Sequence, residues 1–218
     1  ARNLGILAPA TALPTHIKGT MLSEACLYTC SNNETTIAIQ QYATASSTFI
    51  IKSIHTTQPV ELLTQYNQSA CLWQALLQGE KMTTQNGQHK NSLLKNQLFF
   101  TTVPGSSYTT SIQAPGEYNI IEILVNDSLA EEFKPLFPAL FTGNVHNSTI
   151  DADLHQYIDS IRTARMSGVL WNYYIVARIK DILFHTCTKI VAAAQNPLSI
   201  TEAEWEGVNK AAEIITED

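Results

Sequence analysis

The hydrophobic period of the chain changes at about Val125, and this change constrains the fold more than any other feature. From about Thr20 to Val125, Val, Ile, Thr, Tyr and Phe recur in short runs broken by Gly, Asn and Pro, a pattern typical of β-strands. After Val125, apolar residues recur at three- and four-residue steps, which is typical of amphipathic helices. The sequence therefore predicts a strand-rich unit followed by a helical one.

Six strands are expected in the first unit. They cover residues 35–42, 48–54, 70–78, 97–103, 107–113 and 117–125. Turn sequences separate them: Gln85-Asn86-Gly87 predicts a hairpin loop, and Pro104-Gly105-Ser106 and Pro115-Gly116 predict turns. Strands at this spacing predict an antiparallel sandwich or barrel.

The strand at residues 117–125 is apolar on both faces. Ile121 and Ile123 share one face with Val125, while Tyr118, Ile120 and Leu124 share the other. We therefore expect it to be covered on both sides. Two acidic residues of this strand, Glu117 and Glu122, point to opposite faces at this spacing, so we expect solvated or hydrogen-bonded carboxylates rather than an acid-base pair.

The charge of the chain is unfavourable for nucleic acid. The 218 residues carry a net charge of -6, which is the wrong sign for a phosphate backbone. Residues 1–125 hold six basic and six acidic side chains, while residues 126–218 hold seven and thirteen. We therefore expect this part of the protein not to bind DNA by itself.

Several functional classes have no support in the sequence. The apolar runs are too short to cross a bilayer, and the first residues lack the pattern of an export signal. The four cysteines are not spaced as a zinc site or a disulfide framework: Cys26, Cys30, Cys71 and Cys187. Reduced thiols in a cytoplasm are the expectation, with no membrane association.

Three helices are expected after Val125. The first begins at Ser128, with Glu131 at capping-box spacing. The second covers residues 152–165, and the third, the longest, covers residues 169–194. An apolar stripe runs along the third helix: Val176, Ile179, Leu183, Cys187, Ile190 and Ala194. This stripe fits either a second subunit or the chain's own barrel, and further apolar residues at 169–174 suggest that the helix contacts both.

The final segment has the clearest helix start in the chain. Thr201 and Glu204 stand at capping-box spacing, and Ile200 is placed to pack on Trp205 as a hydrophobic staple. Three stretches in this order, at residues 117–129, 173–184 and 198–215, resemble the AraC family of bacterial transcription regulators. They are similar, respectively, to the last barrel strand entering a helix, the long helix before the linker, and the segment that opens the helix-turn-helix region.

This resemblance implies an α+β fold, a cupin-like antiparallel β-barrel followed by an α-helical dimerisation region. It divides the chain into an N-terminal arm (1–19), an effector-binding barrel (20–126), a helical dimerisation region (127–198) and a linker helix (199–218). It implies a cytoplasmic homodimer that senses a small-molecule effector. DNA would be contacted only through a C-terminal helix-turn-helix domain that this sequence does not contain. The six residues of the apolar stripe are then the expected dimer interface.

Catalysis is not expected. His55 and His89 are isolated, so the paired histidines of a metal-binding cupin are missing, and no nucleophile elbow, phosphate loop or dinucleotide fingerprint occurs. We therefore expect no enzyme activity, no metal and no cofactor. Two alternatives stay open: a cupin-type metal-dependent enzyme, and an extracellular ligand-binding module, which four glycosylation sequons would suit.

Four aromatic residues are candidates for ligand contact, because aromatic rings in short strands can stack on a small organic molecule. They are Trp73, Phe99, Tyr108 and Tyr118. The alternative is that these side chains form the core of the barrel.

Overall fold

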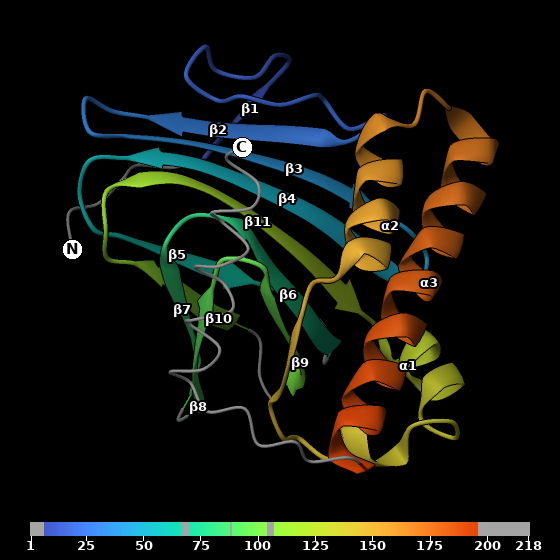
Figure 1. The fold of residues 1–218 in the computed structure, drawn as a ribbon. Helices are drawn as coiled ribbons and strands as arrows, with labels where there is room; N and C mark the ends of the chain where they lie inside the picture. The colour runs from blue at the N-terminus through green and yellow to red at the C-terminus, as the bar shows by residue number, and fades with distance from the viewer. Residues whose placement is uncertain (1–6, 67–69, 88, 104–106, 196–218) are drawn as a thin grey trace, which may run out of the picture.

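The computed structural model describes residues 7–66, 70–87, 89–103 and 107–195. These residues form two antiparallel sheets packed face to face, with α-helices against the outer face of the larger sheet (Figure 1). The fold class predicted from the sequence, a cupin-like antiparallel barrel followed by helices, is confirmed. The expected linker helix at residues 199–218 lies outside the described residues.

The larger sheet has eight strands, and the first strand of the chain forms one of its edges. In spatial order they are β1 (Ala8–Ala10), β2 (Cys26–Ser31), β3 (Thr35–Ala43), β4 (Ser47–Thr56), β11 (Gly116–Val125), β6 (Ala70–Gln78), β9 (Gln97–Val103) and β12 (His146–Thr149). Two of them lie outside the predicted barrel boundaries: β1 belongs to the expected arm and β12 to the expected helical region. Each pairs with an established strand, β1 with β2 and β12 with β9.

The smaller sheet has four strands. In spatial order they are β5 (Val60–Gln65), β10 (Ser107–Ile112), β7 (Lys81–Asn86) and β8 (His89–Leu94). β7 and β8 form the predicted hairpin, in which Asn86 pairs with His89 and Gly87 has φ +56°. Glycine adopts this left-handed conformation at no steric cost.

Three α-helices follow the barrel: α1 (Asp127–Phe133), α2 (Ala152–Thr163) and α3 (Gly168–Gln195), with a 3-10 turn, η1 (Pro138–Phe141), after α1. α1 does not begin at Ser128 as predicted. Its N-cap is Asn126, whose side chain accepts the Leu129 N–H, while the Ser128 hydroxyl donates to Asn126. An asparagine at the N-cap satisfies a free amide as well as a serine does. The capping residue therefore lies two positions before the predicted one.

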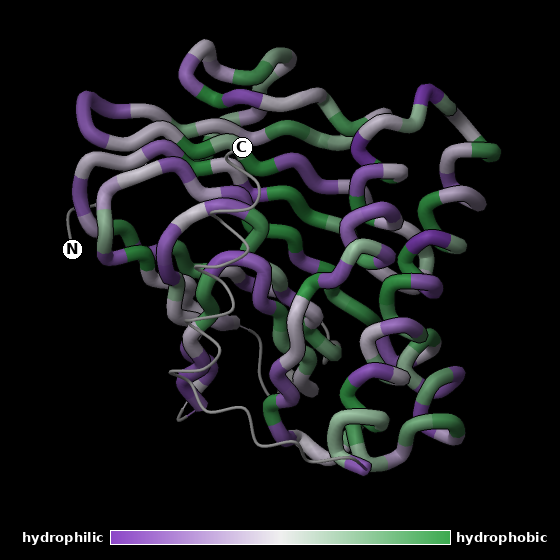
Figure 2. Tube along the Cα trace, in the orientation of Figure 1, coloured by the Kyte–Doolittle hydropathy of each residue, from purple (hydrophilic) through white to green (hydrophobic). Residues whose placement is uncertain are grey.

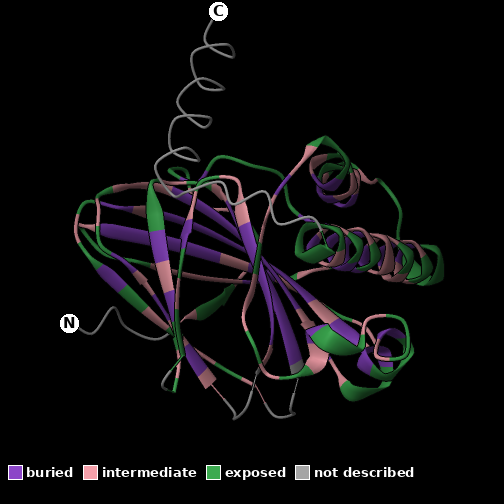
Figure 3. Ribbon diagram, turned by 60° about the horizontal axis from the view of Figure 1, so that its bottom comes forward, coloured by how far each residue is buried: buried purple, intermediate pink, exposed green. Residues whose placement is uncertain are grey.

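The two larger cores lie on the two sides of the larger sheet. Between the sheets lies the barrel core, which includes Ile54, Leu72 and Ile120. Between the larger sheet and the helices lies a second core, which includes Phe49, Ile121 and Ile179. Figure 3 shows buried residues concentrated along the central strands, and Figure 2 shows hydrophobic and hydrophilic residues alternating along α3. Because β11 separates the two cores, both of its faces are buried, as predicted.

Candidate ligand-binding site

Two opposite charges are buried inside the barrel. Lys52 on β4 and Glu122 on β11 are 2% and 0% exposed, and Lys52 Nζ lies 2.7 Å from Glu122 Oε1. The two strands are paired antiparallel with Ile120 opposite Lys52, so Glu122 is the diagonal neighbour on the same face. The pair is electrically neutral as a unit, which makes its burial tolerable only while both partners remain.

Uncharged polar side chains complete this pair. Tyr108 donates to Glu122 Oε2 at 2.6 Å, and Gln74 Nε2 donates to Glu122 Oε1 at 2.6 Å. Lys52 also donates to Thr64 Oγ1 at 2.8 Å, and its ammonium group lies 5.2 Å from the centre of the Tyr108 ring. Burial, reinforced by the Glu122 carboxylate, raises the pKa of Tyr108 well above its usual value, so its hydroxyl stays protonated as a donor.

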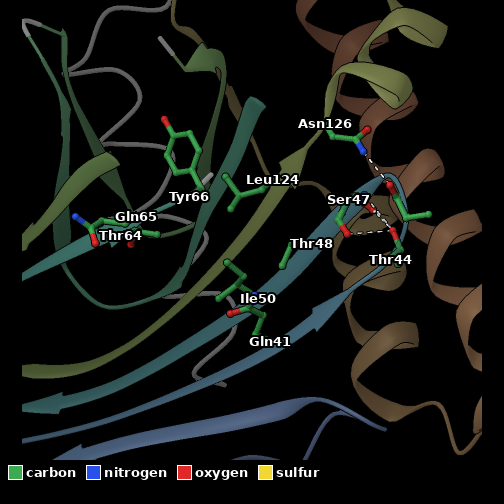
Figure 4. Close-up of a pocket in the computed structure, with 11 residues that line it drawn as sticks. Gln41, Thr44, Ser47, Thr48, Ile50, Thr64, Gln65, Tyr66, Leu124 and Asn126 are labelled. Carbon is green, nitrogen blue, oxygen red and sulfur yellow. Dashed lines mark hydrogen bonds between the residues drawn. The ribbon is translucent and has the colours of Figure 1, made fainter. Parts of the chain in front are cut away.

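A pocket opens beside this buried cluster. It has a cavity volume of about 520 Å³ and lies between the end of β5 and the larger sheet, as Figure 4 shows. The lining residues come from β3, β4, β5, β11 and the loops that follow them: Gln41, Thr44, Ala45, Ser47, Thr48, Ile50, Thr64, Gln65, Tyr66, Leu124 and Asn126. None of these described lining residues carries a charge. A volume of this size is typical of small-molecule sites.

Two pocket residues, Thr64 and Tyr66, contact members of the buried cluster. The Thr64 hydroxyl accepts the Lys52 hydrogen bond and also lines the pocket, so it joins the two. The Tyr66 ring lies 6.0 Å from the Tyr108 ring, and burial raises the pKa of Tyr66. The Tyr66 hydroxyl is buried without a hydrogen-bond partner in the described part of the chain. Leaving a buried hydroxyl unpaired costs free energy.

The rim of the pocket is attached to the helices through Asn126. Thr44 organises the turn between β3 and β4 by accepting the Ser47 N–H at 3.0 Å and donating to the Ser47 carbonyl at 3.0 Å. Asn126 Nδ2 donates to the Ala45 carbonyl at 2.8 Å, and the Asn126 N–H donates to Ser46. Asn126 is also the N-cap of α1, so one residue joins the pocket rim to the start of a helix.

Trp73, one of the four predicted ligand-binding residues, lies on the other face of the sheet. It is 0% exposed, belongs to the core under the helices, and donates from Nε1 to Thr186 Oγ1 of α3 at 3.0 Å. The strand alternation places Gln74, not Trp73, inside the barrel. The prediction for Trp73 is corrected: its role here is to join β6 to α3.

The other three predicted residues do lie inside the barrel, but none lines the pocket. Phe99 and Tyr108 are 2% and 1% exposed, and Tyr108 reaches the pocket only through its ring contact with Tyr66. Tyr118 packs over Gly79, where an added Cβ would lie 2.2 Å from the ring, and donates to the Ala114 carbonyl. All three belong to the barrel core, the alternative considered from the sequence, but Phe99 and Tyr118 also line two small cavities elsewhere in the barrel. Ligand contact by these three residues stays a prediction.

The predicted interface stripe on α3 also needs correction. Ile179, Leu183, Cys187 and Ile190 are at most 8% exposed and belong to the core between α3 and the larger sheet. A second subunit cannot reach side chains that the chain's own sheet covers. Val176 is half-buried and Ala194 is exposed. The stripe is therefore an internal packing face in its central part.

Another side of α3 exposes three large apolar residues, with the ion-paired Lys180 and Asp181 between two of them. Leu170, Tyr173 and Phe184 are 73%, 70% and 53% exposed. Their separations of three and eleven residues place them on one side of the helix. Leu170 and Tyr173 belong to the further apolar residues at 169–174 expected from the sequence, whereas Phe184 lies outside that range.

The pocket residues were missed because most are small polar residues at strand ends. One signal was present: Lys52 interrupts an apolar strand at residues 49–54, and Glu122 interrupts another at residues 120–125. A charge on a face that is otherwise buried indicates a paired polar site.

Metal-binding clusters and membrane-spanning helices do not occur among the described residues. There, no group of three or more His, Cys, Asp or Glu residues is close enough to hold a metal ion. No helix among the same residues has the length and apolarity to span a membrane.

Comparison with known proteins gives similarity in structure but not in sequence. No sequence family matches the chain, and no curated protein is similar to it. The AraC-like transcriptional activator CuxR superposes with a TM-score of 0.50 at 11% identity, covering 83% of this chain and 60% of that one. The fold is thus shared with CuxR, and the chain spans 60% of CuxR's length.

Two further structures are similar at lower scores. ToxT from Vibrio cholerae has a TM-score of 0.40 and 5% identity, covering 63% of this chain and 56% of that one. The cupin domain of Schizosaccharomyces pombe Cnp3 has a TM-score of 0.34 and 12% identity, covering 48% and 73%.

Proposed function

We propose that this chain is the effector-sensing half of an AraC-type bacterial transcription regulator, and that it acts without catalysis in the cytoplasm. The observation that carries the proposal is the pocket at the mouth of the barrel, with Asn126 shared between its rim and the start of α1. The fold shared with an AraC-like activator, CuxR, supports it. A DNA-binding domain would belong to the same protein and follow the helical region.

The signal would pass from the pocket to the helices. A ligand that contacts the turn at Ser47 changes the hydrogen bonds that this turn makes with Asn126, and hence the start of α1. α1 is joined to α3 by an ion pair in which Lys180 Nζ lies 2.6 Å from Glu132 Oε2. A ligand that binds two arrangements of this pathway unequally shifts the population between them.

The protein would act as a homodimer, since two DNA-binding domains must be held at a fixed spacing to recognise paired half-sites. The exposed face of α3, formed by Leu170, Tyr173 and Phe184, is the proposed contact. It replaces the buried stripe that the sequence suggested. Large exposed apolar side chains are typical of such surfaces.

The test uses the full-length gene product and DNA from upstream of its own gene. Fluorescence anisotropy at fixed salt measures the DNA affinity before and after addition of the small-molecule fraction of a source-cell extract. We expect the affinity to change by about 5- to 150-fold, and Leu124→Trp, which fills the pocket, to respond less. A full-length protein that binds no DNA, or whose affinity is the same with and without the extract, would contradict the proposal.

A further inference from the structure

The two sheets of the barrel end in four edge strands, and three of these are protected against pairing with a further strand. β1 has three residues and contains Pro9, which has no amide hydrogen to donate. β12 has four residues and lies against α3, whose Lys189 donates to the Thr149 carbonyl at 2.9 Å. β8 carries the exposed Lys90, a residue type that opposes strand addition. The fourth edge strand, β5, contains neither proline nor lysine.

β5 presents a regular edge for pairing. Its residues pair with β10 in one continuous antiparallel register, from Val60 opposite Ile112 to Gln65 opposite Ser107. No bulge interrupts this ladder, and β10 is the only partner strand of β5 in the described part of the chain. In an antiparallel pair, the N–H and C=O groups of alternate residues point away from the partner. The other side of β5 therefore offers a row of main-chain donors and acceptors to a further strand.

The side chains of β5 define which strand would fit beside it. On the outer face of the smaller sheet, Leu63 is 64% exposed, and Glu61 is exposed two positions away. The ion pairs found among the described residues do not include Glu61. On the inner face, Leu62 packs against the barrel core but is only partly buried. A strand with a basic side chain beside Glu61 and apolar side chains beside the two leucines would pair the carboxylate and bury the apolar surface.

We propose that β5 binds an extended, basic segment of another protein, which adds to the four-stranded smaller sheet as an antiparallel strand. A lysine or arginine of this segment lies beside Glu61, and its apolar side chains lie beside Leu62 and Leu63. Main-chain hydrogen bonds supply affinity, and the alternate side chains supply specificity. Glu61 selects basic over acidic segments, because like charges on neighbouring strands destabilise the pair. This surface is separate from the α3 contact and adds a partner to the proposed sensor.

The experiment uses the fluorescently labelled peptide Thr-Val-Leu-Val-Lys-Val, which in antiparallel register places its lysine beside Glu61 and its leucine beside Leu63. Fluorescence anisotropy measures its affinity for the protein, and we expect a Kd of about 10–100 μM. The same peptide with glutamate in place of lysine binds at least about tenfold more weakly. Glu61→Lys reverses this preference. The control Asp153→Lys, at an exposed position of α2, leaves it unchanged.

Main-chain pairing is tested separately from the side chains. N-methylation of alternate residues of the peptide removes either the N–H groups that face β5 or those that face solvent. Methylation of the first set abolishes binding, while methylation of the second set changes the Kd by less than about threefold. Bound peptide also slows amide hydrogen exchange in β5 but not in β8, the matched control edge of the same sheet.

Three results would overturn the proposal. They are the absence of binding by the lysine peptide up to about 1 mM, equal binding of the lysine and glutamate peptides, and equal effects of the two methylation patterns. A fourth is a wild-type dimer that Leu63→Lys converts to a monomer in analytical ultracentrifugation, since β5 would then contact a second copy of this chain. The extract-dependent DNA affinity of the full-length protein is measured independently, so the sensor function can stand if β5 binds no peptide.

Discussion

Lys52 and Glu122 show how a single residue pair controls the barrel interior. Replacing Lys52 with Met removes one charge and leaves the Glu122 carboxylate buried and unpaired. We predict a loss of about 3–5 kcal/mol in the free energy of unfolding, measured by urea denaturation. The double variant Lys52→Met/Glu122→Leu recovers much of this loss, because no buried charge remains.

Lys134 supplies the control for this prediction. It pairs with Glu131 in α1, where the two side chains are 43% and 64% exposed. Lys134→Met is expected to cost much less than Lys52→Met, because solvent screens an exposed ion pair. If Lys52→Met costs no more than Lys134→Met, the buried pair does not have the role assigned to it.

At the residue scale, sequence reasoning located faces better than partners. The alternation along β11 placed Ile121 and Tyr118 correctly on opposite sides. It could not show that Lys52 lies diagonally across from Glu122, because that contact depends on the register between strands 70 positions apart in sequence. Trp73 was assigned to the pocket because the sequence does not reveal which of two apolar faces lies under the helices.

Asp151 connects two elements, α2 and α3. It caps α2 by accepting the Leu154 N–H at 3.0 Å, and its Oδ2 lies 2.8 Å from Lys189 Nζ and 2.9 Å from His185 Nε2 on α3. Burial alone would raise the pKa of Asp151, but the hydrogen bonds from Lys189, His185 and Leu154 outweigh it and hold the pKa below its ordinary value.

A carboxylate with a lowered folded-state pKa contributes stability that is present above the unfolded pKa, about 3.9, and is lost as pH falls below it. We predict that Asp151→Asn, which keeps the cap and removes the charge, destabilises the protein by about 1 kcal/mol at pH 7. The difference from wild type shrinks when urea denaturation is repeated below about pH 4. Asp153→Asn, at an exposed first-turn position of α2, should show a smaller loss. A deficit in Asp151→Asn that is constant from pH 7 to the acid range would refute the linkage.

At the element scale, regular alternation or helical period predicted the structure well. The predicted strand at residues 70–78 matches β6, and the predicted third helix, residues 169–194, is within one residue of α3 at both ends. Strands with polar sequences were missed. β8 reads His-Lys-Asn-Ser-Leu-Leu and β12 reads His-Asn-Ser-Thr, and each forms at a sheet edge, where pairing rather than side-chain pattern determines the strand.

For the whole molecule, the exposed face of α3 makes a direct prediction about assembly. The wild-type chain should sediment as a dimer in analytical ultracentrifugation. The double variant Leu170→Glu/Phe184→Glu should sediment as a monomer, because charged side chains would be buried unpaired in the contact. The control is Leu63→Glu, which changes an equally exposed apolar residue on β5. A wild-type monomer at every concentration, or a double variant that remains dimeric, would remove this face from the account.

At the scale of the whole molecule, the sequence predicts the order of barrel and helices but not the pocket. The order of a barrel followed by helices follows from the change of period at Val125, and it suffices to suggest an architecture shared with CuxR. The pocket could not be predicted, since it forms where β5 of one sheet meets β4 and β11 of the other. Neither sheet alone contains the site.

The central claim is that this chain senses a ligand on behalf of a DNA-binding domain in the same protein. The most direct measurement is to sequence the native gene beyond the codon for Asp218. The account predicts about 100 further residues, enough for one domain, that are helical, basic and arranged as two helix-turn-helix units. A stop codon directly after Asp218, or a downstream domain without such units, would contradict it.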